Sequence, residues 1–261
     1  MKSKYRNAAF SVFLPIVLSQ LATAQINESD TMRLQLQLSL TGSYQKGNVE
    51  ILTILSRNEF LIRLFPNWVF KTQISSLYTE FSDKKIDNNI FSRSALYYKP
   101  YKRVFGYVSP FVSTNYRRKI QFRYFIQSGP TWQAIRNETM VVKLSTNLVY
   151  ESTLFTDTVF NESSYNGNER ISLWRSTIYV GGWVFALQHK LRINYEFFWQ
   201  PALDNSKNYR TQFEAGLNYP IWKGLGINVV YIYSHENVVV EGIKKDDRIL
   251  TFGLSYMLRK K

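Results

Sequence analysis

The sequence contains no cysteine and only two histidines, His189 and His235, among its 261 residues. The absence of cysteine excludes disulfide bonds, thiolate metal sites, redox pairs and a cysteine nucleophile. The chain must therefore gain its stability from packing and hydrogen bonding, and any histidine chemistry is confined to two positions.

Long apolar runs are also missing, because no stretch of about 18 to 20 apolar residues occurs in the chain. This excludes a bundle of transmembrane helices. Acidic residues are few, with 19 Asp and Glu against 33 Lys and Arg, which gives a formal net charge of +14. The basic residues are scattered, and no zinc-finger spacing, glycine-rich phosphate loop or RNA-binding motif accompanies them. We therefore expect no nucleic-acid partner.

Aromatic residues are abundant instead, at 16% of the chain, although the mean hydropathy is −0.25. A high aromatic content is the opposite of the composition of disordered chains. The combination requires an architecture that displays many large rings and is still polar on average.

Residues 1–24 have the features of a secretory signal peptide. The first six residues include three basic ones, a mostly apolar stretch follows over residues 8–18, and residues 22–24 form an Ala-Thr-Ala cleavage site. Removing these three positive charges lowers the formal net charge from +14 to +11. We expect residues 25–261 to form one exported domain.

The exported part alternates between apolar and polar residues. The alternation is strict from Arg33 to Tyr44 and recurs at residues 140–150, 187–200, 209–219 and 250–258. Weaker versions lie at residues 50–64, 68–81, 89–98, 104–116, 122–134, 170–182 and 225–235. A period of two indicates strands with one apolar and one polar face. About a dozen residues, at about 3.3 Å each and a tilt near 40°, cover the roughly 25 Å apolar height of an outer membrane.

The connections between these twelve strands differ in length. Those at 65–67, 99–103, 135–139, 184–186 and 220–224 are short, whereas 153–168 and 236–246 are long. Short turns at one end and an even strand count predict an all-β fold, an antiparallel transmembrane up-and-down β-barrel of about 12 strands with both termini in the periplasm. Pro110 and Pro130 fall inside predicted strands, where we expect either a shared bulge or shifted strand boundaries.

Aromatic residues cluster near the predicted strand ends, as in the two girdles that mark the headgroup levels of an outer-membrane barrel. The tryptophans that we expect as membrane-interface anchors are Trp68, Trp132, Trp183, Trp199 and Trp222. A soluble β-sandwich is the alternative, but it would not usually place its rings at strand ends.

The last predicted strand resembles the assembly signal of outer-membrane barrels. Thr251, Gly253, Tyr256 and Leu258 supply its polar, glycine, aromatic and hydrophobic positions, and three basic residues follow at 259–261. The resemblance implies recognition by the barrel-assembly machinery.

Two segments resemble the salt-induced outer-membrane proteins, a family whose domain has no known function. Residues 41–48 (TGSYQKGN) resemble the family's S/T-G-x-Y-x-x-G-N opening, and residues 247–256 (DRILTFGLSY) resemble its closing strand. The resemblance implies a small outer-membrane barrel of the Gram-negative cell envelope with a link to salt or osmotic stress. It implies no catalytic residues.

The sequence offers little for catalysis. Barrel phospholipases carry a His-x-Ser pattern, and neither His189 nor His235 is followed by it. We expect His189 to face lipid and His235 to lie near the long loops. The acidic residues of the long loops lack the spacing of an EF-hand. We predict no catalytic residue, no metal and no cofactor, so the chain is not expected to be an enzyme. A lipid-acting enzyme that uses His235 is an alternative.

The polar faces of the strands are expected to line a narrow, net-basic lumen. The candidate lining residues are Lys190, Arg192, Glu196, Arg210 and Glu214. Twelve strands lie between filled eight-stranded barrels and open porins of sixteen or more. We therefore predict a non-enzymatic outer-membrane barrel, with a small-solute or anion channel as the alternative. Its expected partners are outer-membrane lipid and lipopolysaccharide, which its basic loops and tail attract, and a monomer is favoured.

Overall fold

The computed structural model describes residues 26–30, 32–46, 50–82 and 84–260. The predicted signal peptide, residues 1–24, lies outside the described residues. Among the described residues, no helix is long and apolar enough to cross a membrane.

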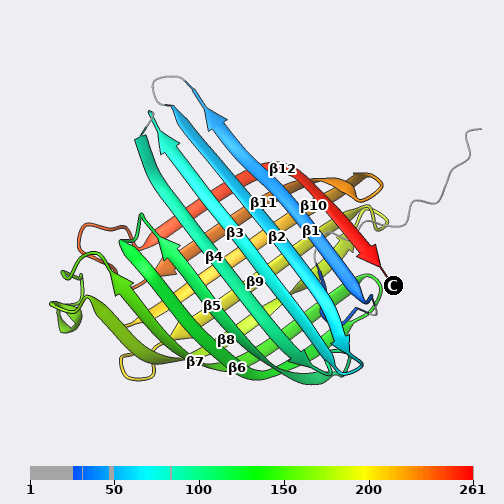
Figure 1. Cartoon of the computed structure of the whole chain (residues 1–261), viewed down its shortest axis with the longest axis horizontal. Helices are drawn as coiled ribbons and strands as arrows, with labels where there is room; N and C mark the ends of the chain where they lie inside the picture. The colour runs from blue at the N-terminus through cyan, green and yellow to red at the C-terminus, as the bar shows by residue number, and fades with distance from the viewer. Residues whose placement is uncertain (1–25, 31, 47–49, 83, 261) are drawn as a thin grey trace, which may run out of the picture.

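Twelve antiparallel strands form one closed barrel, which confirms the predicted fold class (Figure 1). The strands are β1 (Leu34–Gln45), β2 (Ile51–Phe65), β3 (Trp68–Phe81), β4 (Lys84–Tyr98), β5 (Val104–Asn115), β6 (Ile120–Arg136), β7 (Met140–Phe155), β8 (Arg170–Ala186), β9 (Leu191–Pro201), β10 (Tyr209–Trp222), β11 (Leu225–Glu236) and β12 (Asp246–Lys260). Each strand pairs with its neighbours in the chain, and β1 pairs with β12 from Leu34↔Lys260 to Gly42↔Phe252. Closure gives each of these strands a partner on both sides.

The two ends of the barrel differ. The short connections β2–β3, β4–β5, β6–β7, β8–β9 and β10–β11 lie at one end, which we call the turn end, together with the beginning of β1 and the end of β12. The opposite end, which we call the loop end, carries the two long loops at 156–169 and 237–245 and a 3₁₀ turn at Ser163–Tyr165. The predicted sorting of connections by length therefore holds for these long loops, although β3–β4 and β5–β6 are also short at the loop end.

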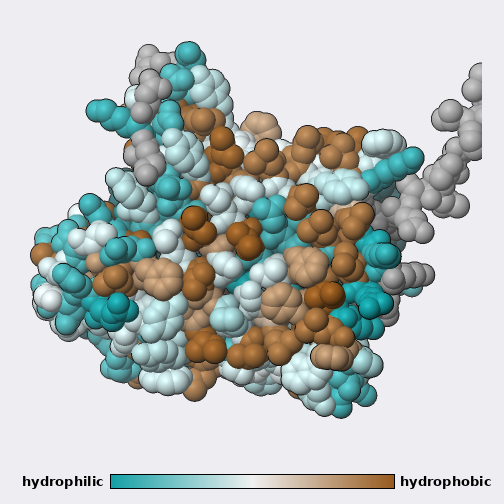
Figure 2. All heavy atoms as spheres, in the orientation of Figure 1, coloured by the Kyte–Doolittle hydropathy of each residue, from teal (hydrophilic) through white to brown (hydrophobic). Residues whose placement is uncertain are grey.

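The alternating residues fall on opposite faces of the barrel wall. In β1 the polar Gln35, Gln37, Ser39 and Thr41 are buried in the interior, while Leu38 and Leu40 are exposed on the outside. The exposed apolar residues extend around the barrel: Ile54, Ile74, Ile126, Leu148, Ile178, Leu217, Ile227, Leu250, Phe252 and Leu254. Figure 2 shows one face of the barrel, with hydrophobic residues (brown) across the middle and hydrophilic residues (teal) at both ends. Such a large exposed apolar surface indicates contact with an apolar phase.

The two prolines inside strands do not form a shared bulge. The β5–β6 register runs without a shift through Gly106↔Pro130 and Pro110↔Ile126. Each proline instead interrupts the pairing on its other side, because the β4–β5 ladder has a gap opposite Pro110 and the β6–β7 ladder has one opposite Pro130. The Ser109 hydroxyl donates to the Ser94 carbonyl oxygen at 2.6 Å, which supplies a donor where Pro110 has none.

The turn between β8 and β9 lies at residues 187–190, whereas the sequence predicted it at 184–186. Leu187, Gln188 and His189 have φ angles of 50°, 54° and 69°, so the chain reverses direction there and β9 begins only at Leu191. The apparent alternation over residues 187–190 therefore belongs to a turn. Lys190 is exposed in this turn and is not a residue of the inner wall, contrary to our expectation.

Candidate functional site

Many charged side chains lie inside the barrel, and one cluster surrounds Glu151 near the loop end. The Glu151 carboxylate lies 3.6 Å from Arg123 Nε, 3.1 Å from Arg175 Nε and 2.8 Å from Arg210 Nη2. Arg123 also donates to both carboxylate oxygens of Glu236, at 2.8 and 2.9 Å. These residues come from β6, β7, β8, β10 and β11, so the cluster ties much of the wall together through charge-assisted hydrogen bonds.

Ion pairs cross the middle of the interior from one wall to the other. Arg57 of β2 forms a bidentate pair with Glu214 of β10, with Nη2 and Oε2 2.8 Å apart. Arg93 of β4 reaches Glu196 of β9, with Nη2 and Oε2 3.5 Å apart. Since β2 and β10, like β4 and β9, are not neighbours in the barrel, these pairs span the lumen.

Aromatic rings lie beside these charges in the middle of the interior, so the lumen is not purely polar. Phe111 of β5 stacks on Phe125 of β6, with ring centroids 3.9 Å apart, and meets Phe91 of β4 edge to face at 4.6 Å. The guanidinium of Arg210 lies 5.1 Å from the Phe125 ring. A cavity of about 230 Å³ remains between these rings and the ion pairs that span the lumen.

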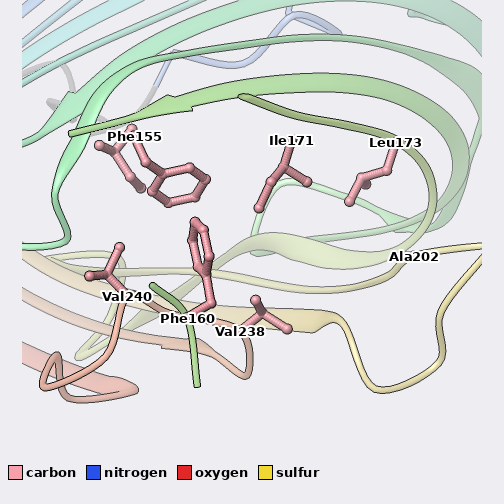
Figure 3. Packing of buried hydrophobic residues seen from close by; sticks show 8 residues of the cluster. Phe155, Phe160, Ile171, Leu173, Ala202, Val238 and Val240 are labelled. Carbon is pink, nitrogen blue, oxygen red and sulfur yellow. The ribbon is translucent and has the colours of Figure 1, made fainter. Parts of the chain in front are cut away.

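The loop end is covered by an apolar cap. Phe160 of the β7–β8 loop pairs with Val240 of the β11–β12 loop as an isolated bridge. The cap consists of buried residues from these loops and the strand ends below them: Ile120, Phe155, Phe160, Ile171, Leu173, Ala202, Val238 and Val240. Figure 3 shows Phe155 and Phe160 packed edge to face, with centroids 4.9 Å apart, and the aliphatic residues around them. Apolar packing therefore holds the two long loops together at this end of the barrel.

The turn end is occupied by residues 26–30, which we call the N-terminal segment. Lys143 Nζ lies 2.5 Å from Glu28 Oε1 and donates to Asn27 Oδ1 at 2.9 Å. Lys71 Nζ donates to the Ile26 carbonyl oxygen at 3.0 Å, and the Ile26 side chain is buried against Leu61 and Val69. The segment thus has both polar and apolar contacts with the inner wall.

Further hydrogen bonds fix the other end of the N-terminal segment. Ser29 Oγ donates to the Pro100 carbonyl oxygen at 2.7 Å, and Arg136 Nη2 donates to the Ser29 carbonyl oxygen at 2.7 Å. Burial raises the pKa of Glu28, but Lys143 and Lys71 lower it by more, so this pKa lies below its ordinary value of 4.5. The carboxylate is therefore charged at neutral pH and holds the segment in place. Sequence reasoning missed this segment; its only signal was a pair of acidic residues, Glu28 and Asp30, before the first strand.

The predicted lumen residues are placed as follows. Glu196 and Glu214 line the central cavity, Arg210 lies in the cluster around Glu151, and Arg192 is buried near the turn end. Lys190 is the exception, since it lies in the β8–β9 turn.

Four of the five predicted anchor tryptophans lie on the outer face. Trp68, Trp132 and Trp222 are exposed towards the turn end and Trp199 towards the loop end, and Trp222 is 66% exposed. Trp183 is different, because it lines the interior and lies 4.6 Å from the Arg192 guanidinium. The strand β8 continues to Ala186, and every second residue of it faces inward. Trp183 therefore lies on the same inner face as the buried Arg175 and Thr177.

The residues of the predicted assembly signal occupy both faces of β12. Tyr256 and Leu258 are exposed outside, whereas Thr251 Oγ1 lies inside the barrel and accepts a hydrogen bond from Thr41 Oγ1 at 2.8 Å. Gly253 sits against β1, where a Cβ would lie 2.2 Å from the Leu40 carbonyl oxygen. Glycine is therefore required at the seam where the barrel closes.

His235 lies on the outer face near the loop end. Its Nδ1 is 2.9 Å from Asp246 Oδ1, and its ring stacks on Tyr209 at 5.5 Å. Thr211 pairs with it across β10–β11, but within the described residues no hydroxyl bonds its Nε2. A nucleophile activated by His235 would need such a contact. His189 lies in the β8–β9 turn next to Phe185, not on the lipid-facing side of a strand as expected.

The described residues hold no group of three or more His, Asp or Glu side chains arranged to bind a metal ion. The interior offers ion pairs and aromatic surface, with the apolar cap at one end and the N-terminal segment at the other.

Solved outer-membrane proteins share the fold. A NanC porin aligns over 86% of this chain and 100% of its own, at 12% identity and a TM-score of 0.51. The translocator domain of the autotransporter NalP from Neisseria meningitidis aligns over 85% of this chain and 86% of its own, at 12% identity and a TM-score of 0.45. An outer-membrane channel from Pseudomonas putida F1 aligns over 87% and 93%, at 10% identity and a TM-score of 0.41.

No curated protein matches the sequence. A family model described as "Protein of unknown function, DUF481" matches residues 38–258, from β1 to β12. Because this match covers almost the whole barrel, the chain belongs to the DUF481 family.

Proposed function

We propose that this chain is a non-enzymatic outer-membrane protein of the Gram-negative cell envelope, whose narrow lumen is closed at both ends by its own chain. The observation that carries the proposal is that packed segments of the chain lie at both ends of the barrel. The cap around Phe160 covers the loop end, and the N-terminal segment bound by Lys143 covers the turn end. The ion pairs Arg57–Glu214 and Arg93–Glu196 further divide the space between them.

The membrane assignment is supported by the apolar outer belt and by the fold shared with a NanC porin. In barrels of this kind the short turns and both termini face the periplasm and the longer loops face the exterior. The turn end is then periplasmic, the exposed tryptophans lie at the two membrane interfaces, and the basic loops and tail meet lipopolysaccharide phosphates. Export follows removal of residues 1–24, insertion uses the barrel-assembly machinery, and the barrel acts as a monomer.

Planar-bilayer recording and cell fractionation test the proposal. We expect the full-length product to fractionate with the outer membrane, to migrate faster on a gel before heating than after it, and to give no stable conductance at neutral pH. Purification as a soluble periplasmic protein would contradict the membrane assignment. Large, stable conductance steps of the unmodified protein would contradict the closed lumen.

A small-solute channel is the second candidate, and the central cavity favours it. Transport would then require the closures to move. A variant that weakens both, Glu28→Lys together with Phe160→Asn, should conduct where the unmodified protein does not. Continued silence of a correctly folded double variant would argue for an envelope role without transport.

The link to salt or osmotic stress rests on the resemblance of residues 41–48 and 247–256 to salt-induced outer-membrane proteins. It predicts that the amount of this protein in the outer membrane rises when the medium is supplemented with NaCl. Quantitative mass spectrometry of membrane fractions measures this, and an unchanged amount would separate this chain from that behaviour.

A further inference from the structure

A second cavity opens at the turn end, between the N-terminal segment and the inner wall. It measures about 560 Å³, and its lining includes Asp30, Glu138, Trp183, Arg192 and Arg259. It lies apart from the charge cluster at Glu151, at the opposite end of the barrel. Its lining therefore presents a separate set of polar groups.

Arg192 lines this cavity without a salt bridge to any of the described acidic residues. Its side chain is among the largest fully buried ones, at 1% exposure, and within the described residues it forms no ion pair. Its Nε and Nη2 atoms are buried without a hydrogen-bond partner. The guanidinium instead lies 4.6 Å from the Trp183 ring and 5.8 Å from the Phe185 ring. These rings hold the charge in position but cannot accept its hydrogen bonds in the plane of the guanidinium.

Neighbouring donors share this lack of an acceptor. Trp183 Nε1 and Arg259 Nε are also buried without a hydrogen-bond partner in the part of the chain that the structure describes. Arg259 is partly balanced, since its Nη1 lies 3.6 Å from Asp30 Oδ2. Buried donors are almost always satisfied in folded proteins, and a buried unpaired charge is expensive. Arg123, Arg175 and Arg210, by contrast, share the carboxylate of Glu151 as a counter-charge.

We propose that this cavity binds a small anion that carries a carboxylate or phosphate group, with its negative oxygens held by Arg192 and Trp183 and its charge also balanced by Arg259. Arginine is suited to both groups, because its planar fork donates two parallel hydrogen bonds. The carboxylate of Asp30 pairs with Arg259, and Glu138 is exposed in the β6–β7 turn, so neither forms an ion pair with Arg192.

The bound anion would touch the N-terminal segment as well as the wall. Asn27, Ser29 and Asp30 line the same cavity, and Arg136, which holds the Ser29 carbonyl oxygen, lines it too. The ligand therefore adds contacts between the segment and the barrel. Because a ligand stabilises the state that binds it, anion binding favours the closed turn end.

Calorimetric titration of the folded protein in detergent micelles tests the site. Inorganic phosphate and benzoate serve as separate probes at constant ionic strength set with NaCl. We expect saturable one-to-one binding of at least one probe, weakened at least tenfold by Arg192→Gln. The matched control is Arg103→Gln, because Arg103 is exposed in the β4–β5 turn at the same end of the barrel and lies outside this cavity. Saturation by phosphate alone assigns a phosphate ligand, and saturation by benzoate alone assigns an organic carboxylate.

Absence of saturable binding of both probes would overturn the proposal, as would equal binding by the Arg192→Gln and Arg103→Gln proteins. Gel mobility before and after heating verifies that each variant is folded. If Arg192→Gln does not fold, Trp183→Phe decides, since it removes one donor and keeps the ring. We expect it to weaken binding several-fold, and unchanged affinity would refute the site. Binding in micelles does not depend on conductance, so its failure leaves the closed-barrel proposal standing.

Discussion

Replacing Glu151 by glutamine removes the one negative charge that three buried arginines share. Glu151 is 3% exposed and lies 2.8 to 3.6 Å from them. Arg123 keeps Glu236, and Arg175 keeps the Gln200 and Asn208 carbonyl oxygens, so Arg210 loses most. Removing one partner of a buried ion pair costs about 3–5 kcal/mol. We expect Glu151→Gln to lower the free energy of unfolding by about that amount.

Urea unfolding in lipid vesicles, followed by tryptophan fluorescence, measures this loss. Glu169→Gln is the matched control, because Glu169 is exposed in the β7–β8 loop, and it should change stability by no more than about 0.5 kcal/mol. The double variant Glu151→Gln/Arg210→Met should regain part of the loss, because it no longer buries an unpaired guanidinium. A loss below about 1 kcal/mol in the single variant would refute the assignment of Glu151 as the centre of this cluster.

Three other perturbations address closure and the two caps. Gly253→Ala should abolish the heat-modifiable form, since its Cβ would meet the Leu40 carbonyl oxygen, whereas Gly106→Ala, with nothing within 4 Å, should not. Because the pKa of Glu28 is lowered in the folded protein, its stabilising effect is complete above about pH 4.5 and is lost as the pH falls through the lowered pKa. Proteolysis at residues 26–30 should therefore accelerate at low pH in the unmodified protein. The same fall in pH should not accelerate proteolysis of the Glu28→Gln variant. Phe160→Ala should open the loop end and speed tryptic cleavage at residues 244–245, and an unchanged rate would contradict the cap.

The outer face of the barrel was predictable because it depends on local order. A period of two sends neighbouring residues to opposite faces, so Leu38 and Leu40 point outwards whichever strand lies beside them. The rule failed where a strand end was misjudged. The β8–β9 turn lies at 187–190 and not at the predicted 184–186, so Trp183 is still part of β8 and faces the interior, whereas Lys190 is part of the turn and not of the wall.

The sequence by itself determined twelve alternating strands, a polar inside and an apolar outside, because each of these follows from the spacing of neighbouring residues. Only the tertiary structure decided what the inside does. Glu28 meets Lys143 across 115 positions of the chain, and Arg57 meets Glu214 across 157. Such pairs depend on strand register and barrel closure, which bring distant residues together. The same closure leaves Arg192 Nε and Nη2 without a hydrogen-bond partner among the described residues, which no local pattern in the sequence indicated.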